Sequence, residues 1–230
     1  MVIGTGMIGK RFEAYQNDDR FVIFASGVSN SKNRIDAAYN REIQSLKQTI
    51  EEQQQKIFVY FSTCSLYDPE EENTPYVAHK KNVEHIVQSS CQRFRIFRVS
   101  NLVGRSNNPN TVLNFFVYHI RNQINFDLWS NASRNLLDID DMYSIVDYIL
   151  RGELHTNAVT NIANPSSYKV TEIVAAIEKR WQVQANYVPI PKGSTFNIDI
   201  SAISEIIKQL KIPFPGDYLA KLLEKYYKDK

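Results

Sequence analysis

Apolar and polar positions along the chain form blocks that predict an α/β protein. Short runs of apolar, β-branched and aromatic residues, bounded by polar residues, are typical of strands buried on both faces. Four such runs lie at 1–3, 21–25, 58–62 and 94–99. Apolar residues spaced three and four apart predict helices at 8–16, 34–55, 76–88, 112–122, 138–150, 171–180, 201–210 and 218–227.

Strands that alternate with helices are typical of a parallel sheet joined by right-handed crossovers. All four predicted strands lie in residues 1–105, which we expect to form a Rossmann-like, dinucleotide-binding lobe. Residues 106–230 are predicted to be mainly helical. We expect them to form a smaller substrate-binding lobe that is interleaved with the first.

The first predicted strand runs directly into a glycine-rich turn. Its sequence, Gly4-Thr5-Gly6-Met7-Ile8-Gly9, has the G-x-G-x-x-G spacing and lies between a strand and a helix. Glycines at such positions let the backbone approach a pyrophosphate, and the following helix offers N–H donors. The candidate cofactor-binding residues are therefore Gly4, Gly6, Met7, Ile8 and Gly9.

A second chemical pattern begins where the strand at 58–62 ends. Thr63 follows the strand, and Tyr76 and Lys80 lie four residues apart, so both side chains share one helix face. An ammonium near a phenol favours the phenolate and is expected to lower its pKa, which prepares the phenol for proton transfer. Thr63 can hydrogen-bond the same oxygen. His79, between them, is expected to be an exposed helix residue.

Composition narrows the functional classes. The apolar fraction of 43% suffices for a sizeable core, and a net charge of +2 gives no argument for nucleic acid or an anionic membrane. Two cysteines make no disulfide framework and predict a reducing, cytoplasmic location. No signal peptide or membrane-spanning run is evident, and no metal site is predicted.

Several segments resemble the extended short-chain dehydrogenase/reductase superfamily, in its NAD-dependent epimerase/dehydratase group. FSTCSLYD is similar to that group's strand ending at the catalytic hydroxyl, here Thr63. PYVAHK is similar to its Tyr-x-x-x-Lys element, which gives Tyr76 and Lys80. The resemblance implies a cytoplasmic enzyme that uses NAD or NADP on a nucleotide sugar, with Lys80 also holding the nicotinamide ribose.

The same resemblance assigns further residues. RVSNLVGR implies that Asn101 contacts the sugar-nucleotide, and WSNASRNLLDIDDM implies that Arg134 grips its diphosphate. FVIFASG resembles the group's fourth strand and implies that Ala25, Ser26 and Gly27 line the cofactor. AAYN resembles the helix that follows and makes Asn40 the relay asparagine.

The glycine loop is thus followed almost at once by the fourth strand of the family. We expect the usual second and third strands to be absent, and strand 21–25 to pair directly with strand 1–3. The missing region normally supplies the residue that binds the adenosine ribose, and Lys32 or Arg34 are the candidate substitutes. We expect dinucleotide affinity about 10²–10⁴-fold lower as a result.

Two functional hypotheses remain open at this point. The first is a nucleotide-sugar epimerase or 4-ketoreductase. Within this class a 4,6-dehydratase is disfavoured, because Cys64 and Ser65 stand where the dehydratases carry Asp and Glu. The second is a nucleotide-sugar-binding protein with impaired catalysis. The helices at 41–55 and 76–90 also resemble the pair that forms the family's dimeric four-helix bundle, which implies a homodimer.

Overall fold

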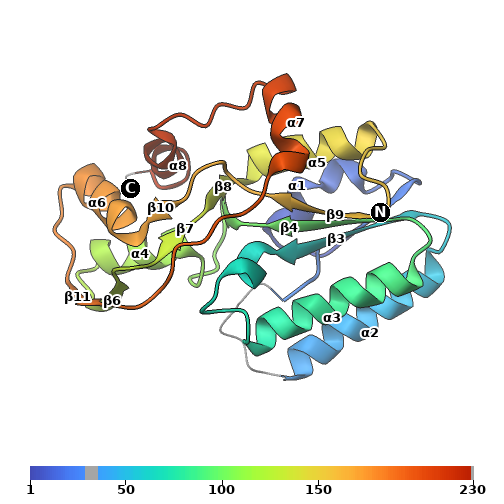
Figure 1. Ribbon diagram of the computed structural model, residues 1–230, viewed down its shortest axis with the longest axis horizontal. Helices are drawn as coiled ribbons and strands as arrows, with labels where there is room; N and C mark the ends of the chain where they lie inside the picture. The colour runs from blue at the N-terminus through green and yellow to red at the C-terminus, as the bar shows by residue number, and fades with distance from the viewer. Residues whose placement is uncertain (29–35, 229–230) are drawn as a thin grey trace.

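The computed structural model describes residues 1–28 and 36–228. Its centre is a parallel sheet with the order β1-β2-β3-β4-β9 (Figure 1). The strands are β1 (Val2–Ile3), β2 (Phe21–Phe24), β3 (Ile57–Thr63), β4 (Phe94–Val99) and β9 (Ala158–Ile162). In the described part of the chain no strand intervenes between β1 and β2, and Val2 pairs with Ile23. The expected direct pairing is therefore confirmed.

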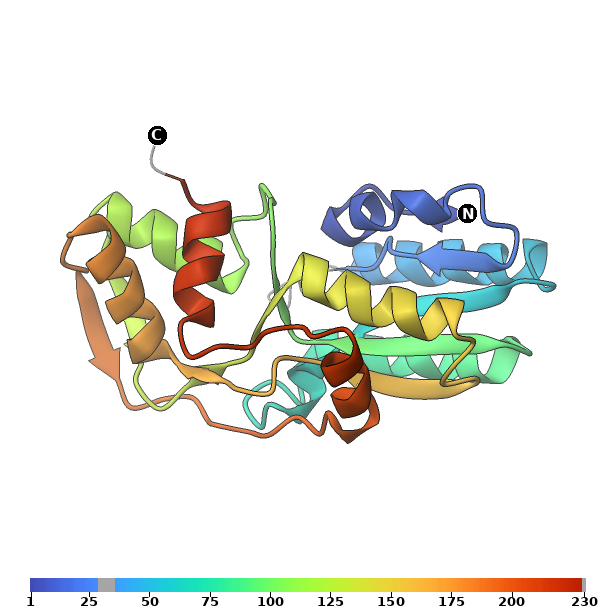
Figure 2. The ribbon, with the colours of Figure 1, turned by 90° about the horizontal axis from the view of Figure 1, so that it is seen from above.

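Helices cover both faces of this sheet. One face carries α2 (Asp36–Glu52) and α3 (Pro75–Ser90), and the other carries α1 (Met7–Arg11) and α5 (Ile139–Arg151) (Figures 1 and 2). Side chains alternate between the two apolar layers: Phe21 and Ile23 of β2 pack with α5, whereas Val22 and Phe24 pack with α2 and α3. All seven residues of β3 are buried, as expected for a central parallel strand.

Most of the remaining elements form a second lobe beside the sheet (Figure 2). Two of its strand pairs are parallel, and the third, β7 with β10, is antiparallel. The strands are β5 (Asn101–Val103) with β8 (Leu136–Asp138), β6 (Phe126–Trp129) with β11 (Tyr187–Ile190), and β7 (Ser133–Arg134) with β10 (Tyr168–Lys169). The helices are α4 (Val112–Arg121), α6 (Val170–Trp181) and α8 (Tyr218–Tyr226), which share one apolar cluster.

Two predicted helices are shorter than expected. The helix predicted at 8–16 ends at Arg11 and continues as a 3₁₀ turn at Glu13–Tyr15, where Phe12 and Tyr15 insert into the core. The helix predicted at 201–210 divides into a 3₁₀ turn at Ser201–Ile203 and α7 (Ser204–Gln209). In both cases packing of the apolar side chains against the sheet determines the local geometry.

Polar contacts join the two lobes at the start of α5. Asp138 is the N-cap of α5 and binds the Nζ atom of Lys225, in α8, at 2.7 Å. Asp140 accepts hydrogen bonds from Lys225 at 2.8 Å and from the Nε atom of Arg11, in α1, at 2.6 Å. Within the described residues, no helix combines the length and apolarity needed to cross a membrane.

Candidate active site

The glycine loop packs tightly against the carboxyl end of β2. Gly4 has a φ of +120°, and a Cβ atom on it would lie 2.4 Å from the carbonyl oxygen of Ala25. A Cβ on Gly9 would lie 2.2 Å from the carbonyl oxygen of Gly4. By contrast, a Cβ on the exposed Gly6 would meet nothing within 4 Å. Close backbone contacts at Gly4 and Gly9 thus fix the loop, whereas the space next to Gly6 is open. An open space beside the backbone suits the close approach of a phosphate.

Thr63 and Tyr76 are brought together by the end of β3 and the start of α3. Thr74 is the N-cap of α3 and Pro75 is its first residue, so Tyr76 is held in the first turn. The hydroxyl of Thr63 accepts a hydrogen bond from the Ser65 N–H at 3.0 Å, and the Thr63 side chain lies near enough to the Tyr76 phenol to act on its pKa. Both side chains are 7% exposed. The structure therefore brings the expected hydroxyl and phenol near one another.

Lys80 lies one turn further along α3, on the same face. Its Nζ atom is 5.9 Å from the centroid of the Tyr76 ring. The ammonium donates to the hydroxyl of Tyr60 at 2.9 Å and to the Oε1 atom of Glu42 at 3.2 Å. It is therefore near the phenol but engaged by a buried carboxylate.

The protonation of Tyr76 differs from the expectation. Burial raises the pKa of Tyr76 to about 12, although the Thr63 side chain acts to lower it. The carboxylates of Glu42 and Glu71 also raise this pKa. The lowering expected from Lys80 is thus wrong for the protein as it stands in this structure, because burial and nearby negative charge outweigh it. Near neutral pH the group is a phenol, ready to donate a proton.

The structure brings the other expected site residues less closely together than Thr63, Tyr76 and Lys80. Asn40 is exposed on α2, whereas its neighbours Tyr39 and Glu42 are buried. Asn101 is half-buried, and its side-chain amide donates to the Asn135 carbonyl at 3.0 Å. Arg134 is also half-buried and lies 3.5 Å from Asp68.

The residues expected to line the cofactor lie at and after the carboxyl end of β2. Gly27 lies directly over Lys80, since a Cβ on it would be 2.7 Å from the Nζ atom. Ala25 is half-buried and Ser26 is exposed, at the carboxyl end of β2. Lys32 and Arg34, the candidates for contact with the adenosine ribose, lie outside the described residues.

Sequence reasoning missed the two buried acids nearest the site, Glu42 and Asp68, and misplaced His79. His79 is 7% exposed and not on the surface, because its ring stacks on Tyr39 with centroids 4.4 Å apart and its Nε2 atom bonds Glu42 at 2.9 Å. A signal was present in the spacing: positions 39, 42, 46 and 50 share one face of α2, and all four are buried.

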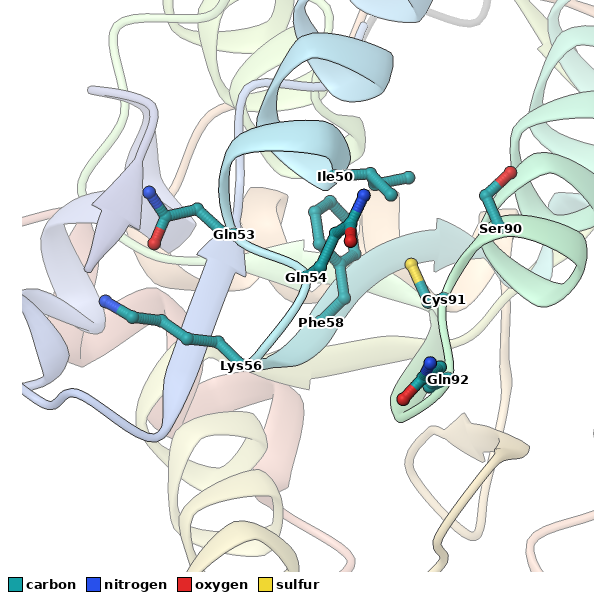
Figure 3. A pocket seen from close by; sticks show the side chains of 8 residues that line it. All are labelled: Ile50, Gln53, Gln54, Lys56, Phe58, Ser90, Cys91 and Gln92. Carbon is teal, nitrogen blue, oxygen red and sulfur yellow. The ribbon is translucent and has the colours of Figure 1, made fainter.

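Two hollows in the described surface lie away from this cluster. The one in Figure 3 is at the amino end of β3, between the carboxyl-terminal ends of α2 and α3, and is lined by Ile50, Lys56, Phe58 and Cys91 among others. A second hollow lies along α5, beside Tyr143 and Arg151. Neither of these two hollows is lined by Thr63, Tyr76 or Lys80.

Comparison with known proteins gives one family match. A protein-family model described as the NAD dependent epimerase/dehydratase family matches residues 20–163. The match starts just before β2 and includes Thr63, Tyr76 and Lys80, but not the glycine loop. A search of curated proteins found no match.

Solved structures show the same fold. dTDP-glucose 4,6-dehydratase from Streptomyces venezuelae, a double mutant with NAD bound, is 17% identical, with a TM-score of 0.72 over 96% of this chain and 77% of that chain. UDP-glucuronic acid 4-epimerase from Bacillus cereus, with UDP-glucuronic acid and NAD, is 18% identical, with a TM-score of 0.71 over 94% and 76%. RMD from Pseudomonas aeruginosa, with NADPH, is 17% identical, with a TM-score of 0.65 over 82% and 84%.

Proposed function

The chain belongs to the NAD-dependent epimerase/dehydratase family, and from this premise we propose that it is an NAD(P)-dependent nucleotide-sugar epimerase or 4-ketoreductase. The observation that carries the proposal is the proximity of the Thr63 side chain to the Tyr76 phenol, with Lys80 one turn further along α3 and its Nζ atom 5.9 Å from the centroid of the Tyr76 ring. A hydroxyl and a phenol that lie close together can share the oxygen of a sugar carbonyl or carbinol, which supports the proposal.

In the proposed reaction, Thr63 holds the oxygen of the reacting sugar carbon and Tyr76 moves its proton. The bound nicotinamide would supply or accept the hydride. Gly4, Gly6 and Gly9 would hold the pyrophosphate, and Lys80 the nicotinamide ribose. Because Tyr76 is a phenol near neutral pH, it is ready to protonate the alkoxide that forms when a ketone is reduced.

We assign substrate binding mainly to residues 106–230, together with Asn101. Arg134 would bind the diphosphate, since a guanidinium suits planar, bidentate recognition of phosphate. Elimination across C5 and C6 is disfavoured at this site. Burial raises the pKa of the Cys64 thiol to about 12, and the thiol donates to the Arg98 carbonyl, so it is not an available acid or base.

Isothermal titration and turnover assays test this proposal. We expect a nucleotide sugar to bind, NAD or NADP to bind more weakly than to a full-length Rossmann lobe, and turnover to require Tyr76. The second hypothesis, a nucleotide-sugar-binding protein with impaired catalysis, is favoured by one observation: both expected cations, Lys80 and Arg134, lie beside buried carboxylates. It predicts sugar-nucleotide binding that Tyr76→Phe leaves unchanged, with no turnover in either protein.

We further propose a cytoplasmic homodimer in which α2 and α3 pack against the same helices of a second copy. Light scattering at micromolar concentration measures this directly. A dimer mass supports the proposal, and a monomer mass contradicts it.

A further inference from the structure

Glu42 is a buried carboxylate surrounded by donors from three separate elements. It is 3% exposed. The Val28 N–H, in the loop after β2, donates to it at 2.7 Å, and the Tyr60 hydroxyl, in β3, donates at 2.9 Å. His79 and Lys80, both in α3, contact it at 2.9 Å and 3.2 Å. A single side chain of α2 therefore joins a loop, a strand and a second helix.

The charge of Glu42 matters because Lys80 is itself buried. Lys80 is 3% exposed, and burial lowers its pKa, whereas the charge of Glu42 beside it acts to raise it. A lysine removed from water loses its proton unless an anion lies beside it. The hydrogen bond from His79 and the charge of Lys80 lower the pKa of Glu42 to about 2, even though burial, the largest single influence, raises it. Near neutral pH, Glu42 is thus an anion that faces Lys80.

Glu42 also determines what lies over Lys80. The Val28 N–H donates a hydrogen bond to Glu42. This brings the backbone of the preceding residue, Gly27, so close to the ion pair that a side chain does not fit there. A Cβ atom on Gly27 would lie 2.7 Å from the Nζ atom of Lys80 and 3.0 Å from Glu42. The backbone at Gly27 therefore covers the ion pair closely. The position of this loop and the position of the ammonium depend on the same carboxylate.

We propose that Glu42 is a positioning residue of the active site: it is the counter-ion that keeps Lys80 an ammonium, and it holds that ammonium and the Ser26–Val28 loop in place beside Tyr76. The role in catalysis rests on the proposed function, whereas the role as counter-ion does not. Glu42 touches neither the reacting sugar atoms nor the nicotinamide in this proposal, so it acts through Lys80.

Other charged and titratable groups face the same cluster. Glu84, on α3, also acts on Lys80, but its carboxylate is held by Arg98 through contacts of 2.6 and 2.9 Å. Tyr60 faces Lys80 from β3, and Tyr39 and Glu71 act on Tyr76. Among these groups, Glu42 is the carboxylate in direct contact with the ammonium.

The counter-ion role is tested without substrate or cofactor. Protein labelled at the lysine Cε carbon is titrated by NMR, with the Lys80 signal assigned through Lys80→Arg. In Glu42→Gln we expect Lys80 to lose its proton at a pH at least about one unit lower than in the unchanged protein. Glu84→Gln is the matched control: it removes a buried carboxylate from the same helix as Lys80, and it should move the Lys80 titration much less.

An unchanged Lys80 titration in Glu42→Gln would overturn the inference. If that variant does not fold, Glu42→Asp serves instead, since it keeps the charge but withdraws it by one methylene. We then expect a smaller fall in the same direction, and no fall overturns the proposal.

The catalytic consequence is tested separately, with an identified nucleotide sugar. We expect Glu42→Gln to move the high-pH limb of turnover to lower pH by about the same shift as the Lys80 titration, and Glu84→Gln to leave the limb in place. If Glu42→Gln shifted the Lys80 titration but not the high-pH limb of turnover, the positioning role in catalysis would be overturned and the counter-ion role would remain. Absence of turnover in the unchanged protein would refute the proposed function and leave the counter-ion result standing.

Discussion

The Nη1 atom of Arg134 lies 3.5 Å from the Oδ2 atom of Asp68, a carboxylate that is only 4% exposed. The other oxygen of Asp68 accepts hydrogen bonds from the Ser194 hydroxyl at 3.0 Å and from the Glu70 N–H at 3.0 Å. Asp68 therefore joins the turn after β3 to two segments of the second lobe. It also competes for the cation that we assign to the substrate diphosphate.

This relationship gives a prediction for substrate affinity. Asp68→Asn removes a negative charge from the site and releases Arg134, so we expect nucleotide sugars to bind about 3–10-fold more tightly. Arg134→Ala should weaken binding by at least a similar factor and raise KM more than it lowers kcat. Calorimetric titration measures both, with Asp127→Asn, an exposed acid on β6, as the control. Weaker binding by Asp68→Asn would contradict the assignment of Arg134.

Tyr76→Phe tests the proton carrier. The ring and its packing remain while the hydroxyl is lost, so we expect turnover to fall about 10²–10⁴-fold with substrate affinity little changed. Tyr15→Phe is the matched control, because Tyr15 is also buried and its hydroxyl donates to Asp147 at 2.7 Å outside the site. Full turnover of an identified substrate by Tyr76→Phe would end the catalytic assignment.

Gly6→Val separates the cofactor role of the glycine loop from its role in folding. Because a Cβ on Gly6 meets no atom within 4 Å, we expect the unfolding free energy to change by less than about 1 kcal/mol. The added side chain would occupy the space above the loop, so NAD affinity should fall about 10-fold or more. Gly216→Val is the control, since Gly216 is equally open. Equal NAD affinity in all three proteins would place the dinucleotide elsewhere.

A double-mutant cycle measures the Glu42–Lys80 pair. Lys80→Met leaves a buried carboxylate without its cation and should lower the free energy of unfolding by about 3–5 kcal/mol. The double variant Glu42→Gln/Lys80→Met should be less destabilised than the sum of the two single variants, because neither charge is then left alone. Urea denaturation of the four proteins gives the coupling energy. Strict additivity would show that the two charges do not interact.

The low pKa of Glu42 predicts a specific dependence of stability on acidity. A carboxyl whose pKa is depressed on folding stabilises the native state above its unfolded pKa of about 4.5, and the contribution disappears as pH falls toward 2. We expect the stability advantage over Glu42→Gln to shrink by on the order of 3 kcal/mol across this range. Unfolding curves measured between pH 6 and pH 2.5 follow the difference. If the stability difference between the unchanged protein and Glu42→Gln stayed constant over this range, the pKa of Glu42 would not be lowered by its partners.

Much of the fold was predictable because its signals are local and repeated. The continuous apolar run of β3 and the short strands β1 and β2 have the pattern of parallel strands, and the resemblance identified which strands are absent. Thr63 and Tyr76 were predictable from the strand end and the helix spacing. Apart from the absent strands, these inferences need only neighbouring residues and the rule that parallel strands end at one edge of the sheet.

The partners of the expected cations were not predictable in the same way. Lys80 and Glu42 are separated by 38 positions, and Arg134 and Asp68 are distant in sequence, so only the packed structure brings each pair together. The protonation of Tyr76 depends on how completely the site is buried, which composition does not reveal. A polar residue on an amphipathic helix is expected to face solvent, and for His79 this is wrong because Glu42 and Tyr39 of α2 pack against it.

Asp140 is held on one side by Arg11 and on the other by Lys225. Arg11 is synthesised well before Lys225, so the glycine-loop helix has only part of its anchoring until Lys225 has been made. The loop can acquire its final support only after α8 has left the exit tunnel and docked. Maturation of this protein therefore has a built-in order: the sheet can assemble during translation, and the loop over β1 is secured afterwards.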